Sequence, residues 1–436
     1  MLEQLKKLPL VRPAYHFLIA FLGAALYGFP SKRIFVIGVT GTKGKTTVLE
    51  LMNAILEAAG PSTELGVKNK TALLSSITVK IGDHTEKNRT ETTMPGRFFI
   101  QQFLRRAVKA SCEYALIEVT SEGVEQHRHR FINWNAAFLI NLHAEHIEAH
   151  GSFQAYRDQK LAFLKYAAKY GAQLFINRGD KNAGYFIQKL RFTSPVIYSR
   201  EDLPQNIFGS PIYPMQFVVG TKMDETNFFM SDFNRDNAAA AVSLAKFLNI
   251  GRETIERALS NFKGVPGRME FVQREPFAVV VDYAHTPDSL EAVYQAIRNS
   301  KFQIPNSKLI CVLGSAGGGR DKWKRPVLGK IVAEYCDVVV LTNEDPYDED
   351  PLSILNQIEA GFSEISNSKS QTPKKILDRK EAIRMAISVA KNGDTVVITG
   401  KGSEEWIHLK GGKKIPWSDR KATEELLRGK QKSPES

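Results

Sequence analysis

Runs of consecutive apolar residues alternate along this chain with stretches in which apolar residues recur at helical spacing. The apolar run 34–39 breaks into glycines, a lysine and threonines, and helical spacing follows over 48–56. The same alternation continues through the segments 114–119, 136–142, 156–170 and 173–177. Short buried strands that alternate with helices are typical of a mostly parallel sheet covered by helices on both faces. The sequence therefore predicts an α/β fold.

The turn between the first strand and the first helix has the composition of a phosphate-binding loop. It reads Gly41-Thr42-Lys43-Gly44-Lys45-Thr46-Thr47, although Val39 stands where the usual pattern has glycine. Glycines let backbone N–H groups approach phosphate oxygens, the lysine adds a point charge, and the Thr46 hydroxyl is a ligand that suits Mg²⁺. The loop predicts that the chain binds a nucleoside triphosphate.

A second series of strand patterns follows a predicted hinge at 264–267. The strands are expected at 277–282, 309–313, 337–342 and 395–399. The glycine-rich loop 314–319 lacks the spacing of a dinucleotide-binding fingerprint. We expect an apolar helical segment at 1–33, a P-loop parallel-sheet ATPase domain at 34–266, a Rossmann-like domain at 267–428 and a disordered tail at 429–436.

The net charge of the chain indicates which kind of partner it binds. The 436 residues carry 59 Lys and Arg against 47 Asp and Glu, a net charge of +12, which favours anionic partners. No motif that reads DNA or RNA is present, so we expect small phosphorylated or carboxylate-bearing molecules as partners and no nucleic acid.

The three cysteines are far apart and odd in number, which predicts a reducing cytoplasm and no disulfide framework.

The segment 14–29 is apolar but too short to span a bilayer, for which about 20 residues are needed. Lysines and an arginine precede it, but no signal-peptidase site follows before the first strand. We favour a helix packed on the catalytic domain over a helix that rests on a membrane surface.

Three chemistry-bearing residues fall at predicted strand ends. Lys45, Glu118 and His146 each follow a strand, and parallel strands gather their carboxyl ends at one edge of the sheet. His146 and His150 are four residues apart, as zinc ligands on one helical face would be, but the HExxH pattern is missing. Taken alone, each histidine fits a structural role equally well.

Further motifs recur in a fixed order along residues 34–410, and together they resemble the Mur ligases, most closely the MurE branch. These motifs are the glycine loop above, Thr92-Thr93-Met94-Pro95, Glu118-Val119-Thr120-Ser121, Asn141-Leu142 through His150-Gly151, Phe233-Asn234 with Asn237, Gly267-Arg268, Asp282 through Asp288, Gly319-Arg320-Asp321-Lys322, Lys324-Arg325-Pro326, Asp345-Pro346 with Glu349-Asp350-Pro351, and Gly400-Lys401-Gly402. The resemblance implies a cytoplasmic, ATP- and Mg²⁺-dependent enzyme of peptidoglycan synthesis. Such an enzyme joins a muramyl-peptide carboxylate to an amino acid through an acyl phosphate.

The resemblance also implies roles for individual residues. Lys45 would hold the phosphates, Thr46 one Mg²⁺, and Glu118 with His146 a second. Lys160 matches a lysine that many members carry as a carbamate, which would add a metal-facing oxygen anion. Contacts to ATP are expected from 41–47, Asn234, Asn237, Arg268 and Asp282, and contacts to the substrates from Thr92, Thr93, Arg320, Glu344, Asp345, Tyr347, Gly400 and Glu404.

The chain departs from the family pattern in three places. Some 33 residues precede the first strand, too few for the family's UDP-binding domain, so either the donor is held differently or it is not a UDP-sugar peptide. Tyr347 replaces the arginine of diaminopimelate-adding members, amid Asp348, Glu349 and Asp350, which favours an acceptor with a free ammonium such as L-lysine over diaminopimelate. Ser403 and Glu122 replace two family histidines.

Two other functions remain compatible with the sequence. One is another ligase of the same superfamily, of the folylpolyglutamate synthase or pseudomurein type. The other is a nucleotide-dependent switch without catalysis, which would have no reason to keep Lys45, Glu118, His146 and Lys160 together. We expect a monomer with small-molecule substrates, and the segment 14–29 as the one place where the chain would contact a membrane.

Overall fold

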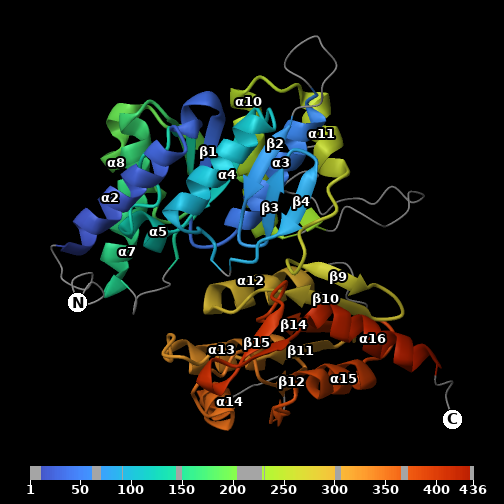
Figure 1. The fold of residues 1–436 in the computed structure, drawn as a ribbon. Coiled ribbons are helices and arrows are strands. Elements are labelled where there is room, and N and C mark those ends of the chain that lie inside the picture. The colour runs from blue at the N-terminus through green and yellow to red at the C-terminus, as the bar shows by residue number, and fades with distance from the viewer. Residues whose placement is uncertain are drawn as a thin grey trace. The chain divides into compact units, whose positions relative to one another are not determined.

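The computed structural model describes residues 11–60, 70–90, 92–143, 150–203, 228–229, 231–299, 306–364 and 372–432. These residues form two units, Met1–Lys263 and Gly264–Ser436, each built on its own sheet (Figure 1).

Unit 1 is built on a sheet of strands in the order β4-β3-β2-β5-β1-β6-β7-β8. The strands are β1 Phe35–Thr40, β2 Thr71–Leu74, β3 Thr78–Ile81, β4 His84–Lys87, β5 Tyr114–Val119, β6 Ala136–Leu139, β7 Gln173–Asn177 and β8 Val196–Tyr198. Neighbours pair in parallel except at the β2–β3 and β3–β4 edge. The predicted mostly parallel sheet is confirmed, but the antiparallel edge was not predicted, because β4 is exposed and polar at every position.

Helices cover both faces of this sheet (Figure 1). They are α2 Val11–Leu26, η1 Pro30–Arg33, α3 Lys45–Ala58, α4 Arg97–Lys109, α5 Ser121–Glu125, α7 Phe153–Lys169, α8 Ala183–Lys189, η2 Arg191–Thr193, η3 Arg200–Asp202, α10 Asp232–Phe247 and α11 Arg252–Ser260. Val36 and Ile117 share a core with α4 and α7. On the opposite face Phe175 of β7 packs edge-on against Phe247 of α10, and α3 packs beside α10.

Unit 2 repeats the α/β design with strands in the order β13-β12-β11-β14-β10-β9, of which only β9 runs antiparallel within the described residues. The strands are β9 Glu270–Gln273, β10 Ala278–Asp282, β11 Leu309–Leu313, β12 Val338–Leu341, β13 Lys374–Lys375 and β14 Thr395–Thr399, with a separate hairpin β15 Trp406–His408 and β16 Lys414–Pro416. The helices are α12 Pro287–Arg298, α13 Lys324–Tyr335, α14 Pro351–Glu359, η5 Ala360–Glu364, α15 Arg379–Val389, η6 Lys410–Gly412 and α16 Asp419–Lys432.

Two expectations from the sequence are wrong. Cys311 in β11 and Cys336 at the end of α13 form a disulfide with an S–S distance of 2.02 Å, where we expected no disulfide. Their separation of 25 residues gave no signal, because only the return of α13 onto the sheet brings the two thiols together. Helix α16 continues to Lys432, so residues 429–432 are helical rather than disordered, and 433–436 lie outside the described residues.

The apolar N-terminal segment forms the helix α2, as expected. Ala20 and Ala24 are buried in unit 1, where α2 packs beside α4, while the other side of the helix is exposed. Among the described residues, no helix is both long and apolar enough to cross a bilayer.

Candidate functional site

The glycine loop lies between the end of β1 and the start of α3. Gly44 precedes the helix with φ of 81°, a left-handed conformation that favours glycine. A Cβ added at Gly44 would lie 2.3 Å from Oδ1 of Asn237 on α10. The first turn of α3 carries no acidic residue, so its backbone N–H groups and the positive end of its dipole are available to an anion.

Asn141, just after β6, holds the loop in this conformation. Its Oδ1 accepts hydrogen bonds of 2.9 Å from the backbone N–H groups of both Thr42 and Lys43, and its Nδ2 donates to Lys43 O at 2.9 Å. β6 ends at Leu139, earlier than predicted, and the chain beyond it turns to meet the loop. Asn141 stands in one of the sequence motifs, but no role was predicted for it.

Glu118 lies at the carboxyl end of β5, which pairs with β1 in parallel. The Glu118 side chain is 2% exposed, and its Oε2 accepts from Thr46 Oγ1 at 3.0 Å and from the Ser76 N–H at 2.8 Å and hydroxyl at 3.0 Å. Its Oε1 lies 3.9 Å from Lys45 Nζ, beyond hydrogen-bond distance. The structure thus brings Lys45, Thr46 and Glu118 together.

Lys160 on α7 reaches the underside of the same loop. It is 1% exposed, and its ammonium donates to Gly41 O at 2.8 Å. The same nitrogen lies 4.5 Å from the centre of the Tyr156 ring, whose hydroxyl is 2.9 Å from Thr42 Oγ1. Lys45 also bends back over the loop and donates to Gly41 O at 3.2 Å. Both predicted catalytic lysines therefore contact the phosphate-binding loop.

The structure describes two of the predicted metal ligands, Thr46 and Glu118, side by side. An anionic carboxylate with one oxygen free of short donors, next to a hydroxyl, is the oxygen-rich donor set that Mg²⁺ prefers, and Glu118 and Thr46 supply it. His146 lies outside the described residues. His150 contacts Ser121 Oγ through Nε2 at 3.1 Å. Within the described part of the chain, no cluster of three or more His, Cys, Asp or Glu side chains suits a metal.

The predicted nucleotide-contacting asparagines lie beside the loop. Asn234 and Asn237 are buried on α10, where Asn237 Nδ2 donates to Asn234 Oδ1 at 3.3 Å and Asn234 Nδ2 to Phe228 O at 2.8 Å. The Thr93 hydroxyl, from the predicted substrate motif, lies 3.0 Å from the Ser76 hydroxyl, which donates to Glu118 and thereby links the two residues. Thr92 is exposed.

A group of cationic side chains next to this motif was not predicted. Arg97 donates to Gln126 O through Nε at 2.9 Å and contacts His16 of α2 through Nη2, while Arg128 donates to Met94 O. Burial and the neighbouring Arg128 lower the pKa of Arg97 to about 10. Among the described residues no carboxylate forms an ion pair with Arg97 or Arg128, and Arg128 Nε is buried without a hydrogen-bond partner. An anionic ligand would satisfy this group.

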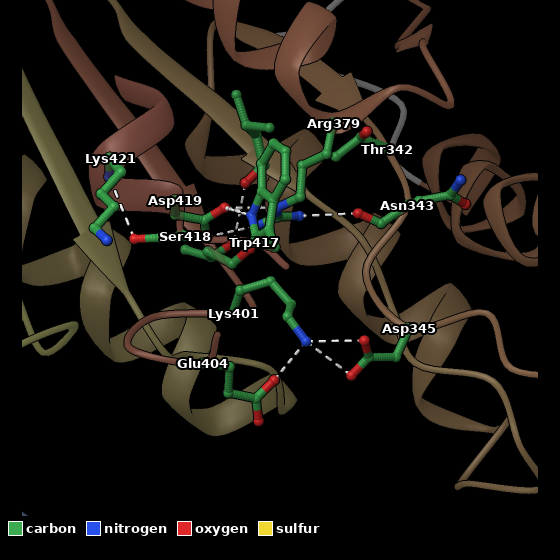
Figure 2. A network of polar contacts seen from close by, with 12 residues as sticks. Thr342, Asn343, Asp345, Arg379, Lys401, Glu404, Trp417, Ser418, Asp419 and Lys421 are labelled. Atoms are coloured by element: carbon green, nitrogen blue, oxygen red, sulfur yellow. Dashed lines mark hydrogen bonds and ion pairs between the residues drawn. The ribbon is translucent and has the colours of Figure 1, made fainter. Parts of the chain in front are cut away.

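In unit 2, Lys401 joins two predicted substrate-contacting residues (Figure 2). Its buried ammonium donates to both Asp345 oxygens at 2.8 and 2.9 Å and to Glu404 Oε2 at 2.5 Å. Glu344 is 6% exposed, and its Oε2 has no hydrogen-bond partner in the described chain. A Cβ at Gly400, whose φ is 107°, would lie 2.5 Å from that oxygen, so only glycine fits beside it.

Arg320 and Tyr347 lie close together on the same unit. The Arg320 guanidinium donates to the Tyr347 hydroxyl at 3.5 Å, and the Tyr347 ring stacks on His408 at 5.1 Å. Burial alone would lower the pKa of Arg320, but Tyr347, Tyr283 and nearby carboxylates hold it above its usual value. Tyr347 has φ of 50°, an uncommon conformation for a side chain of this size.

The acidic residues after Tyr347 are mostly engaged within the protein. Glu349 accepts from buried Arg325 at 3.0 Å, which lowers the pKa of Glu349 to about 2. Asp350 caps α14 by accepting from Ser353 N at 2.9 Å, and Asp348 accepts from Gly411 N at 2.9 Å. These carboxylates therefore shape the loop, whereas Glu344 has a buried oxygen without a hydrogen-bond partner among the described residues.

Arg268 and Asp282, the predicted ATP contacts of unit 2, lie at the ends of neighbouring segments. Asp282 accepts 2.7 Å hydrogen bonds from the backbone N–H groups of Met269 and Ala284, and the Arg268 guanidinium lies 4.2 Å from the Tyr283 ring centre. Burial raises the pKa of Asp282, and Arg268 opposes that shift. Asp282 therefore holds in place the backbone next to Arg268.

A buried ion pair braces the loops that carry these residues (Figure 2). Arg379 donates to Asp419 at 2.7 and 2.8 Å, and also to Asn343 O at 3.1 Å and Thr399 O at 2.8 Å. Asn343 and Thr399 immediately precede Glu344 and Gly400. The guanidinium therefore ties the ends of β12 and β14 together. Arg379 and Asp419 were not predicted, because both stand outside the sequence motifs.

The fold and the loop define the class of a nucleotide-binding α/β ligase with two domains. Residues 39–245 match the Mur ligase middle domain, and residues 267–402 match the Mur ligase, glutamate ligase domain. The chain belongs to the Mur ligase family and is an ATP-dependent acid–amino-acid ligase.

Curated relatives are similar over most of their length. The UDP-N-acetylmuramoyl-L-alanyl-D-glutamate–2,6-diaminopimelate ligase of Syntrophomonas wolfei is 36% identical over 423 residues, which cover 95% of this chain and 82% of that protein. The UDP-N-acetylmuramyl-tripeptide synthetase of Roseiflexus is 33% identical, with coverages of 92% and 80%.

Solved structures agree on the fold. One of a UDP-N-acetylmuramoyl-L-alanyl-D-glutamate–2,6-diaminopimelate ligase aligns with a TM-score of 0.56 and 24% identity, over 92% of this chain and 79% of that one. The Mycobacterium tuberculosis folylpolyglutamate synthase complexed with ADP and AMPPCP aligns with a TM-score of 0.62 and 16% identity, over 87% and 91%.

Proposed function

We propose that the chain joins the carboxylate of a muramyl-peptide donor to the amine of a diamino acid, in peptidoglycan precursor synthesis. The observation that carries the proposal is the gathering of Lys45, Thr46, Glu118 and Lys160 around one phosphate-binding loop. The donor carboxylate attacks the γ-phosphate of ATP to give an acyl phosphate and ADP. The acceptor amine then displaces phosphate and leaves an amide.

In this proposal the loop and Lys45 position the triphosphate and neutralise its charge, which is most of what a protein does in phosphoryl transfer. Thr46 and Glu118, with His146, are the residues that would hold Mg²⁺. The metal would supply charge neutralisation between the two anionic reactants. Arg268 and Asp282 are proposed to contact ATP.

Lys160 is proposed to act as a carbamate. A neutral lysine amine attacks CO₂ and loses a proton, so that a buried cation becomes an oxygen anion next to the loop. Lys160→Ala should abolish amide formation, and short carboxylic acids should restore part of it by supplying the missing oxygens. Unchanged turnover in Lys160→Ala would refute the role. Lys165→Ala, on the same helix, is the matched control and should keep full activity.

The donor is proposed to be held by Thr92, Thr93 and the cationic group of Arg97 and Arg128. Two guanidiniums that form no ion pair with a carboxylate among the described residues suit the carboxylates and phosphates of a peptide-bearing nucleotide sugar. Arg128→Lys keeps the charge but loses the forked geometry, so we expect a higher KM for the donor at nearly constant kcat. An unchanged KM would exclude Arg128 from the donor site.

The acceptor is proposed to be L-lysine in preference to diaminopimelate. Glu344 Oε2 is buried and has no hydrogen-bond partner among the described residues, which suits a ligand ammonium, while Arg320 and Glu404 suit the carboxylate and amine at the other end. Diaminopimelate is the second candidate, because several relatives are named for it. Glu344→Gln should raise KM for lysine while Asp348→Asn does not. Equal rates with both amino acids would refute the preference.

One assay separates the proposed function from its rivals. Phosphate release should require ATP, a muramyl dipeptide nucleotide and a diamino acid together, and mass spectrometry should find the tripeptide product. Release that instead depends on a folate and glutamate would indicate the folylpolyglutamate type. Nucleotide binding without turnover on any pair would indicate a switch.

The cellular setting is part of the proposal. We propose a monomer that works in the cytoplasm, where ATP and activated precursors are available, and that binds no nucleic acid. The cysteine content no longer supports the cytoplasm, since two of the three cysteines are joined. Fractionation of the producing cells and sedimentation of the purified chain test these two points.

A further inference from the structure

Residues 17–26 of helix α2 are all apolar, yet only one side of the helix is covered. Ala20 and Ala24 face unit 1, and Gly23 approaches the backbone of α4 so closely that an added Cβ would lie 3.6 Å from Arg97 O. The opposite side carries large exposed side chains, namely Phe17 at 43%, Leu18 at 54%, Phe21 at 42%, Leu22 at 44% and Leu26 at 69% exposure. A helix that is hydrophobic all round is normally buried on all sides.

The exposed residues form one continuous face. Phe17, Leu18, Phe21 and Leu22 recur with steps of one and four, which places them within a sector of about 140° on an α-helix. The two phenylalanines are held by edge-on contacts with Phe131, at 5.1 and 5.4 Å between ring centres. We call Phe17, Leu18, Phe21, Leu22 and Leu26 the α2 face.

Positive charge borders the α2 face. The helix itself contains no Asp or Glu, and Lys32 and Arg33 follow it in η1, both exposed. The Arg130 guanidinium lies 5.6 Å from the Phe17 ring centre, and the Lys32 ammonium 5.4 Å from that of Phe29. Glu125 is the acid that pairs with Arg12, at 3.7 Å. Residues 1–33 carry five Lys and Arg against one Glu.

We propose that the α2 face binds the surface of a bilayer that contains anionic phospholipids, with the helix lying parallel to the membrane plane. Apolar side chains enter the boundary between headgroups and acyl chains, and the bordering cations meet lipid phosphates. The positive charges that border the α2 face favour an anionic membrane surface as its partner. Two copies of the chain paired through the same face would bring like charges together around an isologous contact. The proposal does not depend on the identity of the ligase substrates.

Vesicle flotation of the full chain tests the proposal. The chain should float with vesicles of phosphatidylcholine and phosphatidylglycerol in equal parts, less with phosphatidylcholine alone, and less again at high salt. Leu18→Asn combined with Leu22→Asn should lower the bound fraction by roughly tenfold or more, because two inserted side chains become polar. These leucines have no ring contact to lose. Lys32→Glu combined with Arg33→Glu should remove the preference for the anionic vesicles.

The matched control is Leu352→Asn combined with Leu377→Asn. These leucines of unit 2 are 45% and 42% exposed, close to the exposure of Leu22 and Phe17. The control should float like the parent chain, and all variants should keep ATP affinity and circular dichroism. Equal flotation of the Leu18/Leu22 variant and the parent would overturn the proposal. So would a parent chain that ignores anionic vesicles, or one that dimerises in a way the Leu18/Leu22 variant abolishes.

Discussion

Removal of the Asn141 side chain should weaken nucleotide binding by more than it weakens the fold. Asn141→Ala deletes hydrogen bonds of 2.9 Å to Thr42 N, Lys43 N and Lys43 O, all of which fix the phosphate-binding loop. Each such bond contributes about 1 kcal/mol net, so the loop loses about 3 kcal/mol of conformational preference. Bound phosphates then have to order the loop themselves.

We expect Kd for ADP and for ATP to rise between roughly 10-fold and 100-fold, since about 1.4 kcal/mol corresponds to each factor of ten and part of the loss falls on stability. Isothermal titration calorimetry with the folded variant measures the change. Asn135→Ala is a control at the opposite end of the same strand, where Oδ1 accepts from Val36 N at 2.8 Å. It should lower stability slightly and leave Kd unchanged. A Kd for Asn141→Ala within twofold of the parent would refute the role of this loop in nucleotide binding.

Three further predictions concern the proposed metal ligand Glu118, the brace of unit 2 and the partly buried acid Asp236. Glu118→Gln keeps an acceptor for Thr46 but loses the charge, and should lower kcat by a factor on the order of 10² or more while thermal unfolding changes little. Arg379→Met leaves Asp419 charged and buried, and should destabilise unit 2 by about 3–5 kcal/mol in urea unfolding, whereas exposed Arg384→Met on the same helix should cost little. Burial raises the pKa of Asp236 to about 6 from an ordinary 3.8, so its ionisation destabilises the fold as pH rises through that window. Asp236→Asn should therefore gain about 2–3 kcal/mol at pH 8 and nothing at pH 3, and an equal gain at both would contradict the pKa.

The arrangement of the candidate site was predicted best where its residues are close together in sequence. The glycine loop, Lys45 and Thr46 stand on one strand-turn-helix unit, and local glycine and lysine chemistry suffices to recognise it. Glu118 was placed correctly because parallel strands bring their carboxyl ends to one edge. Ser76, which donates twice to Glu118, was missed because it lies on a polar turn with no periodic signal.

Residues that act by bracing were also missed. Asn141 contacts a loop about a hundred positions away in the chain. Arg379 contacts segments about twenty to forty positions away. A hydrogen bond of that kind depends on the distance between loops, which composition and spacing do not encode. The Cys311–Cys336 disulfide escaped prediction for the same reason.

The sequence by itself determined the α/β class, the phosphate-binding loop and the strand ends that carry Lys45 and Glu118, because periodicity and turn chemistry act over a few residues. Only the tertiary structure decided which side chains complete the site. Folding brought Lys160 beneath Gly41 and covered one side of α2 while leaving the other exposed. It also placed Glu344 Oε2 beside Gly400, with no hydrogen-bond partner in the part of the chain that the structure describes. These outcomes depend on how separate elements pack, and packing is a property of the whole chain.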